Sequence, residues 1–438
     1  MFLRKPKYNC KAAEYSLLFQ PSGEILSCHY NRGNILGVYP QNSISEIWQG
    51  KKRKRLIKSI HSAKFNEGCY SCKLAIEEGL VHGAGFNKYN YINAENSKNP
   101  ISMEFQLDNI CNLECIMCSG EYSSQIRKNR EKAEPYISPY DDSFVNQLER
   151  FIPFLKHAAF TGGEPFLFEI YYKIWDKIKI LNPNLEIYVS TNGTVLNERI
   201  KEYLEDLNFN ITISIDSLDK TNYEKIRKNA VLEKTLENVD YFNNYLNAKN
   251  KSLNIKCLVI PQNYKDIPDL IDYCNNNGIN LIPKTVILPA FASFERSDNN
   301  ELENIIKLLK TGIKLTETND IINNNNNRFQ EIIDQIQSVL LQKSNIDYTN
   351  LEDKSIDELK TILECKLIDV RNTVPDTKTV SFYKESLLLL YNSIEEEAKL
   401  KSSLIGFIQA PPEILIGEFS RLEIRKLIER FRQSSANF

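Results

Sequence analysis

Hydrophobic and polar positions follow two alternating patterns between about residues 101 and 290. Short apolar runs typical of strands are separated by stretches in which apolar residues recur every three or four positions, as in amphipathic helices. The apolar runs predict six strands, at Ser102–Leu107, Ala158–Phe160, Leu185–Val189, Ile211–Ile215, Ile255–Ile260 and Leu281–Leu288. Helices are predicted between them, among others at Ile170–Leu181, Asn197–Leu207 and Asp266–Asn277. This alternation predicts an α/β protein with a partial parallel (β/α)6 TIM-like barrel, whose ligand-binding residues follow the C-terminal ends of the strands.

The sequence on either side of this region has a different character. Residues 1–98 are rich in turns and carry four cysteines, which predicts a small cysteine-rich α+β module. Residues 291–438 show mainly helical spacing of apolar positions, which predicts a helical C-terminal region. We therefore expect three domains, at 1–98, 99–290 and 291–438. The run Asn323–Asn327 is interpreted as a solvated loop, and the basic run Lys51–Arg55 as a solvated helix face.

Composition narrows the class of protein. The chain has 438 residues with 42% hydrophobic and 26% charged residues and a net charge of −2, so nothing points to nucleic acid or to an anionic membrane. No apolar run approaches the roughly 20 residues of a membrane-spanning helix. The first residues, Met1–Lys7, lack the apolar segment of a signal peptide, so we expect a cytoplasmic protein. Seven of the ten cysteines precede residue 120, which favours metal or cluster ligation over a disulfide framework.

Three cysteines follow the first predicted strand at the spacing C-x3-C-x2-C: Cys111, Cys115 and Cys118. Thiolates select zinc or iron–sulfur clusters. Zinc would require a fourth ligand nearby, and neither His nor Cys follows Cys118 for many residues. The spacing therefore favours a 4Fe–4S cube in which one iron stays open to a small molecule. A chance grouping or a zinc site is the alternative.

Polar motifs follow three of the later strands. Gly162–Glu164 combines two glycines, which allow a ligand to approach the backbone closely, with a carboxylate that can accept hydrogen bonds from an ammonium group. Ser190–Gly193 ends the third strand and Ser214–Asp216 the fourth. Arg227 follows on the next helix, where a guanidinium can hold a carboxylate through two hydrogen bonds. Taken singly, each motif would be interpreted as a turn, a helix cap or a solvated side chain.

The ordered series C-x3-C-x2-C, GGEP, STNG, SID and IR over residues 101–290 resembles the radical SAM enzymes. The resemblance implies that the three cysteines hold a 4Fe–4S cluster whose open iron binds S-adenosylmethionine (SAM). Met117 stands where the family often has an aromatic residue. The implied SAM contacts are Gly162, Gly163 and Glu164 with the ammonium, Ser190, Asn192, Ser214 and Arg227 with the ribose or carboxylate, Asp216 within the same motif, and the Met117 backbone, Val259 and Leu288 near the adenine.

The resemblance also implies the chemistry. A reduced cluster cleaves SAM to methionine and a 5′-deoxyadenosyl radical, which abstracts a hydrogen atom from a substrate C–H bond. It implies an electron donor such as flavodoxin or ferredoxin. The later cysteines, Cys257, Cys274 and Cys365, are interpreted as small buried hydrophobes. The alternative is that one of them donates a hydrogen atom to a substrate radical, and Cys365 is then the preferred catalytic candidate.

The four N-terminal cysteines form a second candidate site. A turn at Gln20–Glu24 brings Cys10 and Cys28 together, and Cys69 and Cys72 supply a C-x2-C pair. Four thiolates suit zinc and an iron–sulfur cluster equally well.

The sequence around these cysteines resembles the SPASM/twitch module, in Phe19–Cys28, Ser45–Trp48 and Cys69–Cys72. The resemblance implies an auxiliary 4Fe–4S cluster, and four cysteines match the shorter twitch form with one cluster. The order is unusual, since this module normally follows the barrel.

Enzymes of this type most often modify peptides or proteins by oxidation, crosslinking or epimerisation, so the resemblance implies a peptide or protein substrate. One alternative is a radical SAM epimerase or dehydrogenase acting on a carbohydrate or small metabolite. Another is a non-catalytic iron–sulfur binding protein. The GGEP and SID motifs argue against the latter, because an electron carrier needs no SAM contacts.

Overall fold

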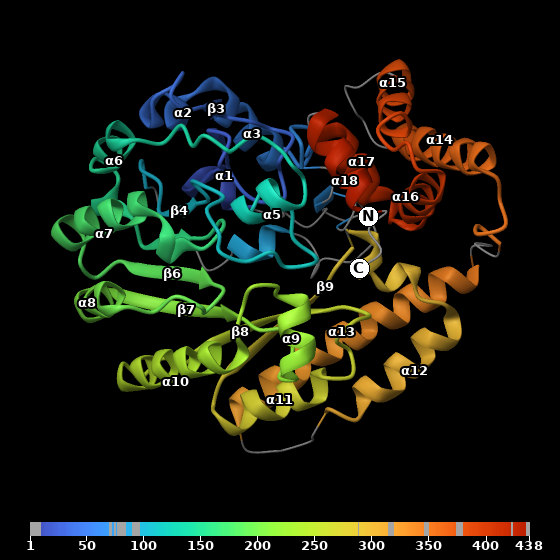
Figure 1. Ribbon diagram of the computed structural model, residues 1–438. Coiled ribbons are helices and arrows are strands. Elements are labelled where there is room, and N and C mark those ends of the chain that lie inside the picture. The colour runs from blue at the N-terminus through green and yellow to red at the C-terminus, as the bar shows by residue number, and fades with distance from the viewer. Residues whose placement is uncertain are drawn as a thin grey trace, which may run out of the picture. The chain divides into compact units, whose positions relative to one another are not determined.

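The chain forms two compact units, Met1–Glu114 with Cys118–Thr212, and Cys115–Met117 with Ile213–Phe438 (Figure 1). The computed structural model describes residues 10–69, 72–73, 76, 85–89, 97–287, 289–313, 319–345, 350–373, 380–421 and 424–434. In this described part, no helix is long and apolar enough to cross a membrane.

The sheet of the first unit combines a short antiparallel meander with parallel strands. Its order is β3-β2-β1-β4-β5-β6, and β7 follows β6. β1 pairs antiparallel with β2, and β2 with β3, whereas β1–β4, β4–β5 and β5–β6 are parallel. Gly23 has φ +85° in the turn between β1 and β2, a conformation that favours glycine. The strands are β1 (Ser16–Phe19), β2 (Glu24–Leu26), β3 (Gly37–Val38), β4 (Ser102–Phe105), β5 (His157–Phe160), β6 (Glu186–Thr191) and β7 (Asn208–Ser214).

Aromatic residues at paired positions of adjacent strands form the core of the first unit. Phe105 of β4 stacks on Phe19 of β1 and Phe160 of β5, with centroids 5.2 and 4.9 Å apart. Phe144 of α6 and Trp175 of α7 pack edge-on against this row. The helical segments of the unit are α1 (Ala12–Tyr15), α2 (Ile44–Gln49), α3 (Lys51–His61), η2 (Gly85–Tyr89), α5 (Ser124–Asn129), α6 (Asp142–Leu148), η3 (Ile152–Phe154), η4 (Pro165–Leu167), α7 (Glu169–Leu181) and α8 (Glu198–Asp206).

The second unit contains the parallel pair β8 (Asn254–Val259) and β9 (Asn280–Thr285), followed by helices to the end of the described chain. Helix α13 packs against both α12 and β9 (Figure 1). The helical segments are α9 (Lys220–Ile226), α10 (Leu232–Ala248), α11 (Ile267–Asn276), η5 (Ala290–Ala292), η6 (Phe294–Arg296), α12 (Asn299–Lys310), α13 (Asp320–Asn345), α14 (Ile356–Thr373), α15 (Val380–Tyr391), α16 (Glu397–Gln409), α17 (Pro412–Arg421) and α18 (Ile424–Gln433).

The predicted fold class is confirmed. The six predicted strands correspond to β4–β9, the three predicted helices correspond to α7, α8 and α11, and the C-terminal region is helical. The basic run Lys51–Arg55 lies at the start of α3 and is mostly exposed, as expected. The predicted domain boundaries at residues 98 and 290 stay a prediction.

The interpretation of Asn323–Asn327 as a solvated loop is wrong, because the run lies within α13. Asn325 is fully buried and its Nδ2 donates to Ile279 O and Asn275 Oδ1, both at 2.9 Å. Its Oδ1 accepts the Leu281 N–H at 2.7 Å. The side-chain amide thus pairs backbone groups at the start of β9, which explains why a polar residue is buried there.

Candidate functional site

The loop that carries Cys111 and Cys118 is fixed by hydrogen bonds to its own ends. Asn109 Nδ2 donates to Gly120 O at 2.7 Å, and Ser124 N donates to Asn109 O at 2.8 Å. Cys111 is buried, and its backbone N–H donates to Ser124 Oγ at 3.2 Å. The first cysteine of the motif is therefore held at the start of α5.

The two glycines of the GGEP turn are required by close packing against the cysteine loop. A Cβ on Gly163 would lie 2.1 Å from Ile110 O, and one on Gly162, where φ is +116°, would lie 2.9 Å from Asp108 O. Glu164 N donates to Ile110 O at 2.7 Å. The first unit thus brings the GGEP turn and the cysteine loop together, and a side chain at either glycine would separate them.

The Glu164 carboxylate is fully buried and engaged by protein donors. It accepts hydrogen bonds from Thr191 Oγ1 at 2.7 Å, Asn192 N at 2.7 Å and Phe166 N at 3.2 Å. Burial raises the pKa of Glu164 to about 7, and these hydrogen bonds act in the opposite direction. Both oxygens therefore connect the turns after β5 and β6, and the expected contact with the SAM ammonium stays a prediction.

Asn192 connects the STNG turn to the cysteine loop. Its Nδ2 donates to Asn112 Oδ1 at 2.9 Å and lies 4.0 Å from Cys111 Sγ. Its Oδ1 accepts hydrogen bonds from the backbone and hydroxyl of Thr194. Ser190, at the end of β6, is half-buried. Sequence reasoning missed Asn112 and Thr194, although an amide between the first two cysteines was a usable signal.

In the second unit, Cys115 lies beside the buried ion pair of Arg227 and Asp216. Arg227 Nη1 is 3.9 Å from Cys115 Sγ, and Arg227 Nη2 is 2.7 Å from Asp216 Oδ2. The Ile116 N–H donates to Ile226 O at 2.9 Å, which fixes the cysteine loop to the end of α9. Burial alone would lower the pKa of Arg227, but the negative charges of Asp216 and Cys115 outweigh it and raise the pKa.

Asp216 is held from two further directions. Its Oδ1 accepts the Leu258 N–H of β8 at 2.7 Å, and its backbone oxygen accepts Asn263 Nδ2, also at 2.7 Å. Asn263 is fully buried and its Oδ1 accepts the Ile260 N–H at 2.9 Å. Sequence reasoning missed Asn263, which lies in the turn after β8. Asp216 therefore fixes Arg227 to the end of β8, and its expected role as a cofactor ligand stays a prediction.

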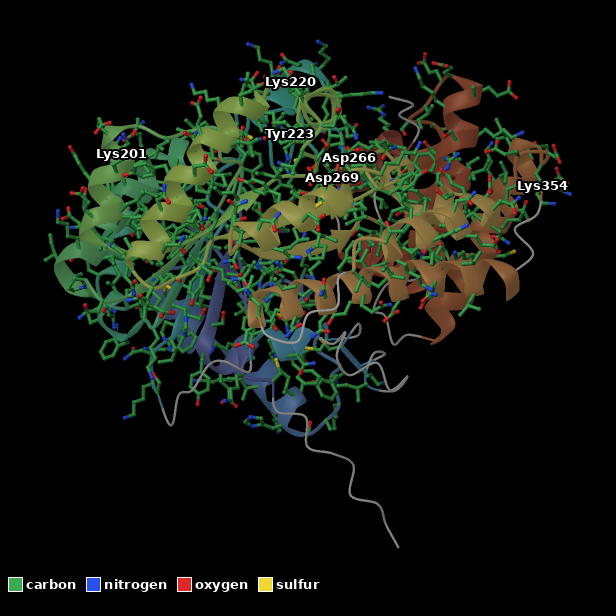
Figure 2. All side chains as sticks on the ribbon, turned by 90° about the horizontal axis from the view of Figure 1, so that it is seen from below. Lys201, Lys220, Tyr223, Asp266, Asp269 and Lys354 are labelled. Carbon is green, nitrogen blue, oxygen red and sulfur yellow. The ribbon has the colours of Figure 1, made fainter. Side chains whose placement is uncertain are left out.

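Helix α9, which ends just before Arg227, is attached to the start of α11. Asp266 Oδ2 accepts hydrogen bonds from Ser217 Oγ and Asn222 Nδ2, each at 2.6 Å. Tyr223 of α9 and Asp266 are both labelled in Figure 2. Tyr223 is fully buried, and its hydroxyl lies 3.2 Å from Thr235 Oγ1. The contacts of Asp266 therefore fix the N-terminal part of the helix that precedes Arg227.

The residues expected near the adenine lie in apolar surroundings. Met117 packs against a cluster of buried apolar side chains. The cluster consists of Ile116, Ile226, Ile260, Val286 and Ala292. Val259 is fully buried, and Ser214 at the end of β7 is half-buried. Leu288 lies outside the described residues. The expected contacts of Met117 and Val259 with the adenine stay a prediction.

The four N-terminal cysteines line one cavity in the first unit, together with aromatic and aliphatic side chains. Burial raises the pKa of Cys10 to about 11 and that of Cys28 to about 12, and the neighbouring thiols add to both shifts. Among the described residues, no three His, Cys, Asp or Glu side chains are close enough to hold a single metal ion. The four thiols nevertheless line the same cavity. As a donor set, four thiols fit an iron–sulfur cluster as well as zinc.

A polar cluster connects this module to the first barrel strand. Glu104 of β4 is buried and lies 2.5 Å from His29 Nε2 and 3.2 Å from Lys88 Nζ. Tyr89, which also lines the thiol cavity, donates its hydroxyl to Glu104 Oε1 at 2.9 Å. Burial alone would raise the pKa of Glu104, but its hydrogen bond with His29 and the charges of His29 and Lys88 hold the pKa at about 2.

The remaining cysteines differ in exposure. Cys257 and Cys274 are fully buried, as interpreted from the sequence, and burial raises the pKa of both thiols. Cys365 is exposed on α14, so its interpretation as a small buried hydrophobe is wrong. Its role as a hydrogen-atom donor stays a prediction.

Comparison with known proteins agrees with this arrangement. Residues 106–274 match the model of the radical SAM superfamily, and residues 10–73 match that of the SPASM iron–sulfur cluster-binding domain. A probable GTP 3′,8-cyclase of Methanocaldococcus jannaschii is 26% identical over 178 residues, 40% of this chain and 56% of the relative. The GTP 3′,8-cyclase of Aliarcobacter butzleri is 27% identical over 173 residues, 38% of this chain and 50% of the relative. The chain thus spans about half the length of these curated relatives.

Among solved structures, Streptococcus suis SuiB bound to the precursor peptide SuiA matches with a TM-score of 0.37 and 15% identity, covering 60% of this chain and 59% of the other. The two family matches contain the motif cysteines and the four N-terminal cysteines, respectively. They confirm the expected cofactors, iron–sulfur clusters and SAM. The chain therefore contains a radical SAM domain, preceded in the sequence by a SPASM-type iron–sulfur cluster-binding module.

Proposed function

We propose that this protein binds a 4Fe–4S cluster through Cys111, Cys115 and Cys118 and uses it with SAM to abstract a hydrogen atom from a substrate. The supporting observation is that two side chains expected to bind the cofactor lie beside motif cysteines. Asn192 Nδ2 is 4.0 Å from Cys111 Sγ, and Arg227 Nη1 is 3.9 Å from Cys115 Sγ. The Asn192–Cys111 contact lies within the first unit and the Arg227–Cys115 contact within the second.

Arg227 has a donor left for the cofactor. Its Nη2 pairs with Asp216, whereas its Nε is buried and has no hydrogen-bond partner in the described part of the chain. A buried N–H without an acceptor is costly, and the SAM carboxylate is an acceptor of the required charge. We therefore assign Arg227 Nε to the carboxylate.

The other motif residues position and shield the cofactor. Bound at this site, the cluster and SAM supply one-electron cleavage of the sulfonium and the 5′-deoxyadenosyl radical. Glu164 holds the turns after β5 and β6 in place, so that Asn192 stays beside Cys111. The apolar cluster around Met117 excludes water from the adenine side. A flavodoxin or ferredoxin is the proposed electron donor.

The test is formation of 5′-deoxyadenosine by anaerobically reconstituted protein with a strong reductant and SAM. We expect product from the wild type and none from Cys115→Ala. Cys274→Ala is the matched control, because this buried cysteine lies outside every motif, and it should retain activity. Equal product from Cys115→Ala would overturn the proposal. So would wild-type protein with a full iron load that yields no product and shows no SAM-dependent change in its cluster EPR signal.

The proposed substrate is a peptide or protein, modified by oxidation, crosslinking or epimerisation. The support is the SPASM-type module, since enzymes with such modules most often act on peptides. The match to this module includes all four cysteines that line the N-terminal cavity.

A second candidate substrate class, anionic small metabolites, is favoured by two exposed lysines. Lys256 of β8 and Lys284 of β9 lie on the same face of the strand pair, while the alternate residues Ile255 and Cys257 are buried. Lysine ammonium groups bind phosphates. The matched curated relatives are named GTP 3′,8-cyclases, which fits this class.

Substrate-dependent formation of 5′-deoxyadenosine separates the two classes. A peptide pool should stimulate product formation and transfer deuterium from labelled peptide into 5′-deoxyadenosine. Stimulation by GTP that is lost in Lys256→Gln/Lys284→Gln, but kept in the exposed-lysine control Lys234→Gln, would favour the anionic metabolite instead.

A further inference from the structure

Asn31 is a buried amide beside the auxiliary thiol site. It is 1% exposed, lies three residues after Cys28 and lines the cavity with the four cysteines. Its Nδ2 atom is 2.8 Å from Glu67 O and 3.2 Å from Cys69 Sγ. A carbonyl oxygen only accepts hydrogen bonds, so the atom facing it is the NH2 group. One N–H therefore binds Glu67 O, and the other is directed at the Cys69 sulfur.

The segment before Cys69 is shaped around this amide. Gly68 has φ +82°, and a Cβ there would lie 2.2 Å from Asn31 Oδ1. Asn34 Nδ2 also donates to Glu67 O, at 3.0 Å. Two asparagines thus hold the same carbonyl, and of the two it is Asn31 whose Nδ2 lies 3.2 Å from the sulfur. Asn34 is consequently a matched control for the effect of Asn31 on the thiolate.

A hydrogen bond donated to a thiolate ligand changes the energetics of the cluster that the ligand holds. The N–H interacts more strongly with the sulfur when the cluster gains an electron, because the added negative charge is shared by the ligands. Donors around ligands therefore raise the reduction potential of a cluster.

We propose that Asn31 is a positioning residue that raises the reduction potential of the auxiliary cluster held by Cys10, Cys28, Cys69 and Cys72. A higher potential makes this cluster a better electron acceptor. The inference rests on the SPASM-type module holding a cluster, and it is independent of the substrate's identity.

The expected effect is a shift of the potential in one direction. Asn31→Leu keeps the approximate volume and removes the donor, so the ratio of reduced to oxidised auxiliary cluster at a fixed potential should fall about tenfold. For a one-electron couple this corresponds to a potential about 59 mV lower. Asn34→Leu removes a bond to the same carbonyl and should leave the potential near the wild-type value.

The measurement is an anaerobic potentiometric titration of the full-length holoprotein followed by EPR. SAM changes the signal of the cluster with the open iron, so the auxiliary signal is the one that SAM leaves unchanged. A lower potential in Asn31→Leu, at unchanged iron and sulfide content and with Asn34→Leu unaffected, supports the proposal. Equal potentials in Asn31→Leu and wild type, or equal shifts in both variants, overturn it.

A second measurement needs no variant. Wild-type protein labelled with 15N in asparagine side chains should show a weak 15N coupling to the reduced auxiliary cluster in pulsed EPR. Absence of this coupling overturns the proposal, and so does a module that holds zinc without labile sulfide. Neither result bears on SAM cleavage, which the 5′-deoxyadenosine measurement tests separately.

Discussion

The Glu164 carboxylate joins the turns that follow β5 and β6, and its replacement tests whether this role is structural. Its Oε1 accepts from Phe166 N and Thr191 Oγ1, and its Oε2 accepts from Asn192 N. In Glu164→Gln the single amide oxygen is best placed at the Oε1 position, where it accepts from both Phe166 N and Thr191 Oγ1. The new NH2 group then faces the Asn192 N–H, so that two donors point at each other and the Asn192 N–H has no acceptor. We expect the end of β6 to loosen.

The size of the effect follows from the group that loses its acceptor. Leaving a buried N–H unpaired costs about 1–3 kcal/mol. We expect a loss of about 2–3 kcal/mol, near the upper end of this range, because two donors are brought together. At 1.4 kcal/mol per factor of ten, this loss raises the equilibrium constant for local opening by roughly 30- to 150-fold. Hydrogen exchange of the Asn192 amide should accelerate by that factor, because exchange reports the free energy of local opening.

Hydrogen-exchange mass spectrometry on peptides that contain Asn192 is the assay. Glu169→Gln is the matched control, since it makes the same chemical change on an exposed carboxylate that pairs with Arg199 at the surface. Exposed pairs contribute about 0–1 kcal/mol, so the control should leave exchange at β6 unchanged. Unchanged exchange in Glu164→Gln, combined with weaker SAM binding, would refute our reasoning and show that the carboxylate acts on the ligand.

The same carboxylate predicts a pH dependence. Burial raises the pKa of Glu164 from 4.5 to about 7, so between these values the folded protein holds a proton that the unfolded chain has lost. Stability must therefore fall as pH rises through this window, by about 3 kcal/mol at 1.36 kcal/mol per pH unit. The difference in unfolding free energy between wild type and Glu164→Gln, measured by urea titration at pH 5 and pH 7.5, should show this loss. A constant difference would contradict it.

Three further changes test other buried polar groups. The pKa of Glu104 is held at about 2 by its cationic partners, so Glu104 should stabilise the fold above about pH 4.5 and lose this effect as pH falls toward 2. The urea midpoints of wild type and Glu104→Gln should therefore converge in acid. A difference between the midpoints that does not depend on pH would argue against this. Asp216→Asn leaves Arg227 buried without an anion and should cost about 3–5 kcal/mol in thermal or urea unfolding, whereas an unchanged midpoint would show that the pair is not needed. Asn325→Leu should cost about 2–3 kcal/mol by leaving backbone groups at β9 unpaired, while the exposed control Asn324→Leu should be nearly neutral; equal effects would refute the burial argument.

The fold was predictable where burial follows local periodicity. β7 alternates half-buried and buried residues along its whole length, and Phe209, Ile211 and Ile213 supply the buried positions. The asparagine run in α13 was not predictable in this way. The partners that make Asn325 a buried residue lie 44 to 50 positions earlier in the chain. Interpreting an asparagine run as a loop takes account of the polar side chains alone and not of their distant hydrogen-bond partners.

For the candidate site, the sequence could not predict which groups the assigned side chains contact. Glu164 and Asp216 were both assigned to the cofactor, and the structure shows their oxygens engaged by protein donors. The donors to Glu164 lie 27 and 28 positions later in the chain. Asp216 accepts from a backbone N–H 42 positions later and pairs with Arg227. A motif gives the chemical type of a side chain, but only the folded chain gives the distances that decide its partners.

The same reasoning accounts for three contacts between cysteine sulfur and a side-chain N–H. Asn31 faces Cys69, and the Asn192 and Arg227 contacts described above repeat the arrangement at two motif cysteines, across 38, 81 and 112 positions of sequence. Thiolates that hold a cluster carry negative charge, and donors directed at sulfur are a recognised way to set its potential. In this view the carboxylates of Glu164 and Asp216 act one step away from the metal. They hold the turn or the guanidinium that presents the N–H, and loss of either should therefore alter a cluster signal before it alters the binding of iron.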